Sequence, residues 1–313
     1  MRVVLGVDGG NSKTELVAAT TAGELLAVAR GPGSNSHAVG VDGVARVLSA
    51  LVAETGAQSP AACGVFYLCG ADVPADLEEL SQMVAVHGWV REAVVDNDTF
   101  ALLRAGTGRA DAVAVICGAG INCVGRRSDG RVARYPALGW ETGDWGGAEM
   151  LGREALFLAA RAEDGRGEQT AMVDAIRAHF GLASVERVGI EIHYGRLAQA
   201  RLGELAPLVL AAARDGDPVA DALVTRGATE VALWVRRAFG DLEVNAADVV
   251  LGGGMFQGEP GPFHERVLER LPAGAHAIVL DAPPVLGAAL AALDLAGAED
   301  AAKARLREEL LAR

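Results

Sequence analysis

The sequence predicts an α/β protein of two similar domains, each with a mixed five-stranded sheet flanked by helices. Two observations lead to this fold class. The chain has 313 residues, of which 51% are hydrophobic, and a chain of this length usually divides its core between two domains. In addition, one order of segments, three strands followed by alternating helices and strands, occurs twice along the chain.

The first copy of this order fills the N-terminal third of the chain. Its three opening strands are short and β-prone, and the turn sequences GGNSK and TAGE separate them. Apolar residues at helical spacing then alternate with further β-prone runs. The expected strands are 2–8, 14–20, 25–31, 64–70 and 92–98, and the expected helices are 41–57, 73–88 and 99–106.

The second copy opens with three more β-prone segments, joined by turns at GAG and SDG. A long helix-rich region follows, and then helix and strand alternate again. The expected strands are 112–118, 121–127, 131–137, 247–254 and 275–281, and the expected helices lie within 146–240, at 263–271 and from 285 onward.

These copies define the expected domains. Residues 1–108 form the first domain, which the C-terminal helix at 290–313 joins, and residues 109–289 form the second. The block from about 146 to 240 has no counterpart in the first half. We therefore expect it to be a helical insertion that shapes specificity or dimerisation.

Charge and composition narrow the class of function. The formal net charge of -13 opposes binding to nucleic acid or to anionic membranes, which Lys and Arg mainly hold. Asp8 and Gly9 interrupt the apolar N-terminal run, so it is neither a secretion signal nor a membrane span, and we expect a cytoplasmic protein. The four cysteines form two C-x5-C pairs in β-prone stretches, which indicates buried free thiols rather than a metal or cluster site.

The stretch LGVDGGNSKT at residues 5–14 is close to a phosphate-binding P-loop, but Ser12 occupies the place of the last glycine. A P-loop and a Rossmann turn both lead into a helix, whereas a strand follows here. We therefore interpret the stretch as a β-hairpin whose Gly9 and Gly10 let backbone amides approach a phosphate. Ser12 and Thr14 add hydroxyl donors. An ordinary hairpin turn is the alternative.

Two further features extend this interpretation. Asp8, at the end of the first strand, is placed to hold a hydrated Mg²⁺ through its waters. The segment CGAGINC at 117–123 is a second glycine turn between strands, which favours phosphate binding over an ordinary hairpin. A third run, VVLGGGMF at 249–256, follows a strand of buried type and would let an adenosine lie against backbone.

Seven motifs occur in a characteristic order from residue 4 to about 297. They are VDGGNSKT, GSNSH, DND, CGAGINC, LGWETGDWGG, LGGGMF and PPVLGAAL. In this order the chain resembles the BadF/BadG/BcrA/BcrD ATPase family, and most of all its N-acetylglucosamine kinase branch. The resemblance implies two ribonuclease H-like domains of the actin-like ATPase superfamily, with the ligand cleft between them, and ATP and Mg²⁺ as the nucleotide and metal.

The resemblance also implies a catalytic base, Asp98, which orients the sugar hydroxyl and accepts its proton during phosphoryl transfer. An Asp is ionised at neutral pH, which suits this role. Capping of the helix at 99–106 is the alternative role of Asp98, and the two roles are compatible. Asp96 is the rival base on the same strand, and the family pattern favours Asp98.

Further site residues follow from the resemblance. The sugar-binding residues it implies are Asn35, Ser36, Asp98, Gly120, Gly139 and Asp144, and the nucleotide-binding residues are Gly9, Gly10, Ser12, Lys13, Gly118, Ala119, Gly253, Gly254 and Gly287. Short polar side chains suit a polyol, because each sugar hydroxyl is both donor and acceptor. Turn formation is the alternative for Asn35.

Two aromatic residues and one departure from the family bear on specificity. Trp140 and Trp145 are candidates for stacking on a sugar face, or else core anchors. Ala119 and Ile121 depart from the commoner family loop G-T-G-S, which removes a hydroxyl donor. The ATP affinity or the acceptor is therefore expected to differ, unless backbone amides suffice.

The predicted activity is ATP-dependent phosphorylation of N-acetylglucosamine at its 6-hydroxyl. Glucosamine, N-acetylmuramic acid and glucose are alternative acceptors. An ATPase activator of a 2-hydroxyacyl-CoA dehydratase is another family function, but the G-G-Q-D stretch of those relatives is missing from this sequence. A non-catalytic sugar sensor would lack Asp98 or the glycine loops, which this chain retains.

The expected partners are a sugar and ATP, with no nucleic acid and no membrane. The helical tail carries an apolar stripe through Leu306, Leu310 and Leu311. This stripe packs back on the first domain or against a second subunit, and family likeness suggests a homodimer.

Overall fold

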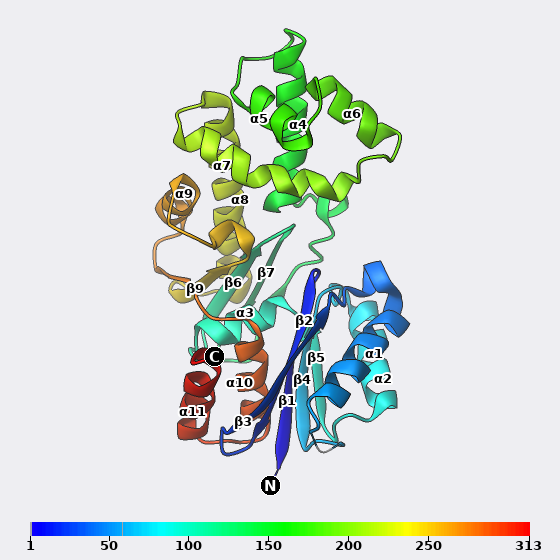
Figure 1. Cartoon of the computed structure of the whole chain (residues 1–313). Coiled ribbons are helices and arrows are strands. Elements are labelled where there is room, and N and C mark those ends of the chain that lie inside the picture. The colour runs from blue at the N-terminus through cyan, green and yellow to red at the C-terminus, as the bar shows by residue number, and fades with distance from the viewer. Residues whose placement is uncertain (1, 58) are drawn as a thin grey trace. The chain divides into compact units, whose positions relative to one another are not determined.

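The computed structural model describes residues 2–57 and 59–313. Contacts within the chain divide it into two compact units (Figure 1). The first unit comprises Met1–Ala114, Val124–Pro136 and Ile278–Arg313, and the second comprises Val115–Cys123 and Ala137–Ala277. The expected domain borders at 108/109 and 289/290 stay a prediction.

The first unit is built on a mixed five-stranded sheet in the order β3-β2-β1-β4-β5. The first three strands form an antiparallel meander, and β4 and β5 continue parallel to β1. The strands are β1 (Val3–Gly9), β2 (Lys13–Thr20), β3 (Leu25–Pro32), β4 (Cys63–Leu68) and β5 (Ala93–Asn97). The carboxyl ends of β1, β4 and β5 therefore meet at one edge, where Gly9 pairs with Leu68 and Leu68 with Asn97.

Helices α1 (Ser36–Glu54) and α2 (Pro74–His87) cover one face of this sheet (Figure 1). Their apolar residues, among them Leu48 and Leu80, form a buried cluster with Leu16 and Phe66 of the strands. By length and composition α1 could cross a bilayer. Its place in this core, and its break at Gly40, identify it as a core helix of the unit.

The opposite face is covered by α10 (Val285–Leu295) and α11 (Asp300–Leu311) (Figure 1). Leu306 and Leu310 are buried there against the sheet, whereas Leu311 is exposed. The tail of the chain thus packs back on the first unit, one of the two arrangements that the apolar stripe allows. Helix α3 (Thr99–Gly106) lies against α10.

The second sheet has the order β10-β9-β6-β7-β8. Its strands are β6 (Ala112–Cys117), β7 (Ile121–Arg126), β8 (Val132–Arg134), β9 (Ala247–Gly252) and β10 (Ala275–Val279). As in the first sheet, its opening strands are joined by tight turns, and β7 and β8 pair antiparallel. Two mixed five-stranded sheets flanked by helices confirm the predicted fold class.

The expected helical block between β8 and β9 contains five α-helices. They are α4 (Gly147–Glu163), α5 (Met172–Phe180), α6 (Val185–His193), α7 (Ala206–Arg214) and α8 (Pro218–Leu242), with the short 3-10 helices η1 (Gly139–Thr142) and η2 (Gln199–Leu205) beside them. After β9 follow η3 (Gly254–Phe256) and α9 (Pro262–Arg270). The long helix α8 packs along α7, α9 and α4, which ties the block to the rest of the second unit.

Candidate functional site

The turn between β1 and β2, residues 9–13, is here called the first glycine turn. It closes through a hydrogen bond of 2.9 Å from the Gly10 amide to the Lys13 carbonyl. The carbonyls of Gly10 and Gly9 accept from the amides of Ser34 (3.1 Å) and Cys69 (2.7 Å). Because these carbonyl oxygens are bound inside the unit, they are turned away from an anion that approaches the turn.

The side chains of the first glycine turn have different surroundings. Ser12 is exposed, so its hydroxyl can reach a ligand. Lys13 donates to Glu15, two residues further along the same strand, at 2.5 Å. Thr14 is fully buried, and its hydroxyl donates to the Pro32 carbonyl while a second hydrogen bond joins it to Ser34. The expectation that Thr14 donates to a phosphate is therefore wrong.

Asp8 lies directly before this turn and is only 8% exposed. Burial, the largest cause, and the nearby charges of Asp98 and Glu15 together raise the pKa of its carboxyl to about 8, against the opposing charge of Lys13. A carboxylate held in such surroundings gains from a cation beside it. The donor set thus fits the hydrated Mg²⁺ that the sequence predicts at Asp8.

Asp98 stands at the start of α3, just beyond the end of β5. It occupies the capping position of the helix but makes no capping hydrogen bond with its side chain. Burial, the largest cause, and the charge of Asp72 together raise the pKa of the Asp98 carboxyl to about 7, although hydrogen bonds from nearby amides partly offset them. A base that loses its proton near neutral pH suits general base catalysis.

The rival carboxylate, Asp96, is already engaged. Both of its oxygens bind the guanidinium of Arg134, one of them at 2.8 Å, and one also accepts from the Asn97 amide at 2.8 Å. A carboxylate held in this way by a bidentate arginine pair is a poor proton acceptor. This geometry favours Asp98 over Asp96 as the candidate base.

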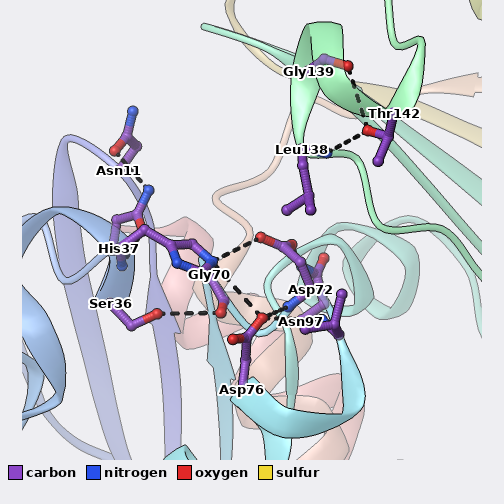
Figure 2. A network of polar contacts seen from close by, with 12 residues as sticks. Asn11, Ser36, His37, Gly70, Asp72, Asp76, Asn97, Leu138, Gly139 and Thr142 are labelled. Atoms are coloured by element: carbon purple, nitrogen blue, oxygen red, sulfur yellow. Dashed lines mark hydrogen bonds and ion pairs between the residues drawn. The ribbon is translucent and has the colours of Figure 1, made fainter.

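Asn35 directly precedes α1, and Ser36, labelled in Figure 2, is the first residue of this helix. The Asn35 side chain caps the helix by accepting from the His37 amide at 2.9 Å, and its amide group donates to Asn11 of the first glycine turn at 3.2 Å. The Ser36 hydroxyl donates to the Gly70 carbonyl at 3.1 Å. Asn35 therefore has a capping role, and both side chains remain partly exposed.

A second group of polar side chains lies next to Ser36. The Nε2 atom of His37 is 3.5 Å from a carboxylate oxygen of Asp72 and 3.7 Å from one of Asp76 (Figure 2). Among the described residues this is the set of His, Cys, Asp and Glu side chains close enough to hold a metal ion. The Asp76 oxygen already accepts from the amides of Val73 and Asp72, which favours an ion pair with His37 over metal binding.

In the second unit, residues 118–120 between β6 and β7 form the second glycine turn. The Gly118 amide donates to the Gly120 carbonyl at 2.9 Å. The carbonyls of Gly118 and Ala119 accept from the first amides of α4, those of Ala148 (2.8 Å) and Glu149 (3.0 Å). Ala119 and Gly120 are exposed, so a ligand can reach this turn.

The four cysteines are free thiols, one pair at the two ends of β4 and the other on either side of the second glycine turn. Cys117 and Cys123, around the second glycine turn, are buried, as is Cys63, and burial raises the pKa of Cys117 to about 12. Cys69 is partly exposed because it follows β4 at the edge of the first sheet, so the expectation of burial is wrong for this one. Thiols with raised pKa are poor metal ligands.

The loop 138–145 brings two predicted sugar-binding residues together. The Gly139 amide donates to the Asp144 carboxylate at 3.2 Å, and the Thr142 hydroxyl also binds this carboxylate. The Thr142 hydroxyl also accepts from the Leu138 amide at 3.0 Å, and its oxygen lies 3.3 Å from the Gly139 carbonyl oxygen (Figure 2). Asp144 thus closes its own loop.

The two tryptophans of this loop differ in exposure. Trp145 is buried, with the Arg226 guanidinium 4.2 Å from its ring centroid, as expected of a core anchor. Trp140 is 74% exposed, which leaves its ring free to meet a ligand.

The remaining nucleotide-binding candidates are three glycines, two of which lie in close packing. Gly253 has φ +93, and a Cβ there would lie 2.5 Å from the Cys117 carbonyl group, so this glycine lets β9 approach the second glycine turn. Gly254 has open space around it. Gly287 lies in α10, where a Cβ would come 1.9 Å from the Ala101 carbonyl of α3. The packing of α10 on α3 alone accounts for a glycine at this position.

Three residues near the candidate base were not predicted from the sequence: His37, Asp72 and Asn97. The DND motif contains Asn97, but only the fold shows that its side chain bonds to Asp72, 25 residues away. The signal that could have found Asp72 is its place in the loop that follows the buried strand β4, at the same sheet edge as Asp98.

Comparison with known proteins identifies the family. The model of the BadF/BadG/BcrA/BcrD ATPase family matches residues 5–292. Over 257 residues the chain is 31% identical to an N-acetylmuramic acid/N-acetylglucosamine kinase of Clostridium acetobutylicum. This match covers 80% of this chain and 84% of that protein. An N-acetyl-D-glucosamine kinase of Dictyostelium discoideum is 25% identical over 316 residues, with 93% and 98% covered.

Solved structures agree on the fold. A candidate N-acetylglucosamine kinase of Chromobacterium violaceum aligns with a TM-score of 0.70 at 24% identity, covering 93% of this chain and 98% of that one. A ROK hexokinase of Thermus thermophilus aligns with a TM-score of 0.54 at 18% identity, covering 94% and 99%. The fold is that of the actin-like ATPases and sugar kinases. Since the family model extends over both glycine turns and nearly the whole length, the chain belongs to the BadF/BadG/BcrA/BcrD ATPase family.

Proposed function

We propose that the protein is an ATP-dependent sugar kinase that phosphorylates the 6-hydroxyl of N-acetylglucosamine. The observation that carries this proposal is the candidate base, Asp98, at the sheet edge beside the first glycine turn. It is supported by family membership and by the relatives named as N-acetylglucosamine and N-acetylmuramic acid kinases. A ROK glucokinase of the same fold has been solved with glucose and AMPPNP, which supports the pairing of sugar and nucleotide.

In the proposed reaction Asp98 accepts the proton of the sugar hydroxyl. The oxygen of that hydroxyl forms a bond to the γ-phosphorus as the bond from the γ-phosphorus to the β-γ bridging oxygen breaks, and ADP leaves. The raised pKa of Asp98 suits this transfer, because a base is most effective when its pKa is close to the working pH. Mg²⁺, when bound, supplies positive charge that neutralises the phosphates.

The other candidate residues hold the two substrates. Amides of the first and second glycine turns bind phosphate oxygens, assisted by the exposed hydroxyl of Ser12, and Asp8 holds the water shell of Mg²⁺. Sugar hydroxyls are held by short polar side chains and loop amides. The proposed sugar ligands are Asn35, Ser36, Gly120, Gly139 and Asp144. The exposed ring of Trp140 is placed to cover a sugar face.

Three further properties belong to this proposal. A cytoplasmic location, a homodimer, and the lack of nucleic acid or membrane partners rest on the acidic net charge and on the family likeness. Light scattering on the purified protein tests the dimer.

A coupled assay of ADP release tests the activity. MgATP is supplied with N-acetylglucosamine, N-acetylmuramic acid, glucosamine or glucose in turn, and the highest kcat/KM is expected for N-acetylglucosamine. Absence of sugar-stimulated ADP release would contradict the proposal. Stoichiometric iron in protein purified without oxygen would instead favour the dehydratase activator.

A further inference from the structure

The side chain of Asn97 connects two segments of the first unit that lie far apart in the sequence. Its Nδ2 atom donates to the carboxylate of Asp72 at 2.8 Å (Figure 2). Its Oδ1 atom accepts from the Thr99 amide at 2.9 Å. Asn97 is only 5% exposed, so these hydrogen bonds are made away from competing water. Asn97 thus spans from the loop after β4 to the first turn of α3.

One end of this connection bears on Asp98. Asp98 lies between Asn97 and Thr99 in the chain, and the hydrogen bond between those two neighbours spans its backbone. The helix start is therefore held by Asn97 rather than by Asp98, whose side chain makes no capping bond. This division of labour leaves the Asp98 carboxylate available to a substrate while its backbone stays fixed.

The other end of this connection contacts the start of α1, which Asn35 caps. The second oxygen of Asp72 lies 3.5 Å from the His37 Nε2, and the His37 amide is bound by Asn35. The same two loops touch again at Gly70, whose φ is +85 and where a Cβ would lie 2.3 Å from the Ser36 hydroxyl. The loop after β4 is thus in close contact with the start of α1.

We propose that Asp72 and Asn97 are positioning residues that set Asp98 relative to Asn35. We call their hydrogen bond the Asp72–Asn97 bridge. This positioning role rests on the proposed kinase function, in which Asp98 receives the proton and Asn35 holds the sugar. Since both partners lie in one compact unit, the bridge fixes the distance between base and sugar ligand before any substrate binds.

An exchange of the two side chains tests the bridge. Asn97→Asp keeps the acceptor for Thr99 but places two carboxylates face to face, so kcat for the sugar should fall roughly 10- to 100-fold, as for a misplaced catalytic group. Adding Asp72→Asn restores one donor and one acceptor with the roles reversed. The double variant should recover at least about fivefold in kcat over Asn97→Asp alone. If it stays as slow as that single variant, the bridge does not position Asp98.

Loss of the contact between Asp72 and His37 should change the KM for the sugar rather than kcat. His37→Gln removes the ion pair with Asp72, so the KM for the sugar should rise about two- to fivefold with kcat nearly unchanged, in the range of a weak ion pair. A KM equal to that of the wild type would contradict the link to Asn35.

A matched control separates positioning from stability. Asp217 caps α8 in the second unit by accepting from the amides of Val219 and Ala220 at 2.9 Å. Asp217→Asn makes the same chemical change as Asp72→Asn. It replaces the oxygen that accepts from the Thr170 hydroxyl and the Ala171 amide with a donor, so it should lower the unfolding temperature while leaving both kcat and KM as in the wild type. Loss of activity in this control would mean that lower stability alone explains the other variants.

A second measurement does not depend on kinase activity. Asn97→Ala removes the acceptor of the Thr99 amide, so hydrogen exchange at Thr99 and Phe100 should accelerate about tenfold or more. Unchanged exchange would overturn the bridge even if the wild type phosphorylates a sugar. A wild type that phosphorylates no sugar, with the expected acceleration in Asn97→Ala, would overturn the proposed function and leave the bridge intact.

Discussion

The two glycine turns have similar backbone hydrogen bonds, but different elements of the chain support them. Each closes by a 2.9 Å hydrogen bond across the turn, and in each the carbonyls are bound by neighbouring amides. In the first glycine turn those amides come from loops, Ser34 and Cys69, whereas in the second they come from the first residues of α4. Backbone geometry is therefore shared, while the supporting elements differ.

The side chains around the two turns differ more than the backbones. Carboxyls with raised pKa, those of the buried Asp8 and the half-buried Asp98, accompany the first glycine turn. The second has buried thiols and an alanine, Ala119, where a hydroxyl is commoner. In the proposed mechanism, proton and cation chemistry therefore belong to the first unit, and the second glycine turn contributes backbone donors. The predictions below test this division.

The largest effect is expected at the candidate base. Asp98→Asn keeps the shape of the side chain and removes its basicity, so kcat should fall roughly 10²- to 10⁴-fold, the usual span for a general base. ADP release in the presence of sugar measures this. The unfolding temperature should change little, because Asp98 makes no capping bond. Turnover equal to the wild type would remove Asp98 from the mechanism.

The second prediction concerns the packing of Gly253 against Cys117, next to the second glycine turn. Gly253→Ala places a Cβ 2.5 Å from the Cys117 carbonyl group at a φ of +93, which should lower the free energy of unfolding by about 1–3 kcal/mol. Urea denaturation measures this loss. The matched variant Gly254→Ala has open space around its Cβ and should lose much less. Equal losses in both would contradict the close approach of β9 to this turn.

The pH dependence of kcat/KM should reflect the titration of Asp98 in the first unit. The pKa of Asp98 is about 7, above its ordinary value, so the base form is lost as pH falls through 7. Below that pH, kcat/KM for the sugar should decrease about tenfold per pH unit. The charges that face Asp98 are those of Asp72 and Asp8. A flat profile down to pH 5 would contradict the raised pKa.

The smallest effect is expected at Ala119. Ala119→Thr supplies the missing hydroxyl at an exposed position, so KM for ATP should fall about two- to tenfold, the value of one hydrogen bond. Ala119→Val has nearly the same shape without a donor and should leave KM unchanged or raise it. Equal KM values for the two variants would show that backbone amides suffice at this turn.

The sequence predicts much of the fold and part of the candidate site. Periodicity and turn residues give the order of strands and helices in both halves, because these signals are local. The pairing of Lys13 with Glu15 is also local, since alternate residues of a strand share a face.

Contacts between distant segments could not be predicted in this way. Thr14 is removed from the first glycine turn by hydrogen bonds to Pro32 and Ser34, 18 and 20 residues away. The Asp72–Asn97 bridge likewise depends on β4 and β5 being neighbours in the sheet. Such pairings follow from topology, which a single sequence leaves open.

The position of the transferred phosphoryl group tests the central claim most directly. Phosphorus–proton correlation NMR of a reaction with MgATP and N-acetylglucosamine should show phosphate on the 6-oxygen, formed in step with ADP, and almost none with Asp98→Asn. Formation of ADP and inorganic phosphate without a phosphorylated sugar, or equal product from Asp98→Asn, would contradict the account.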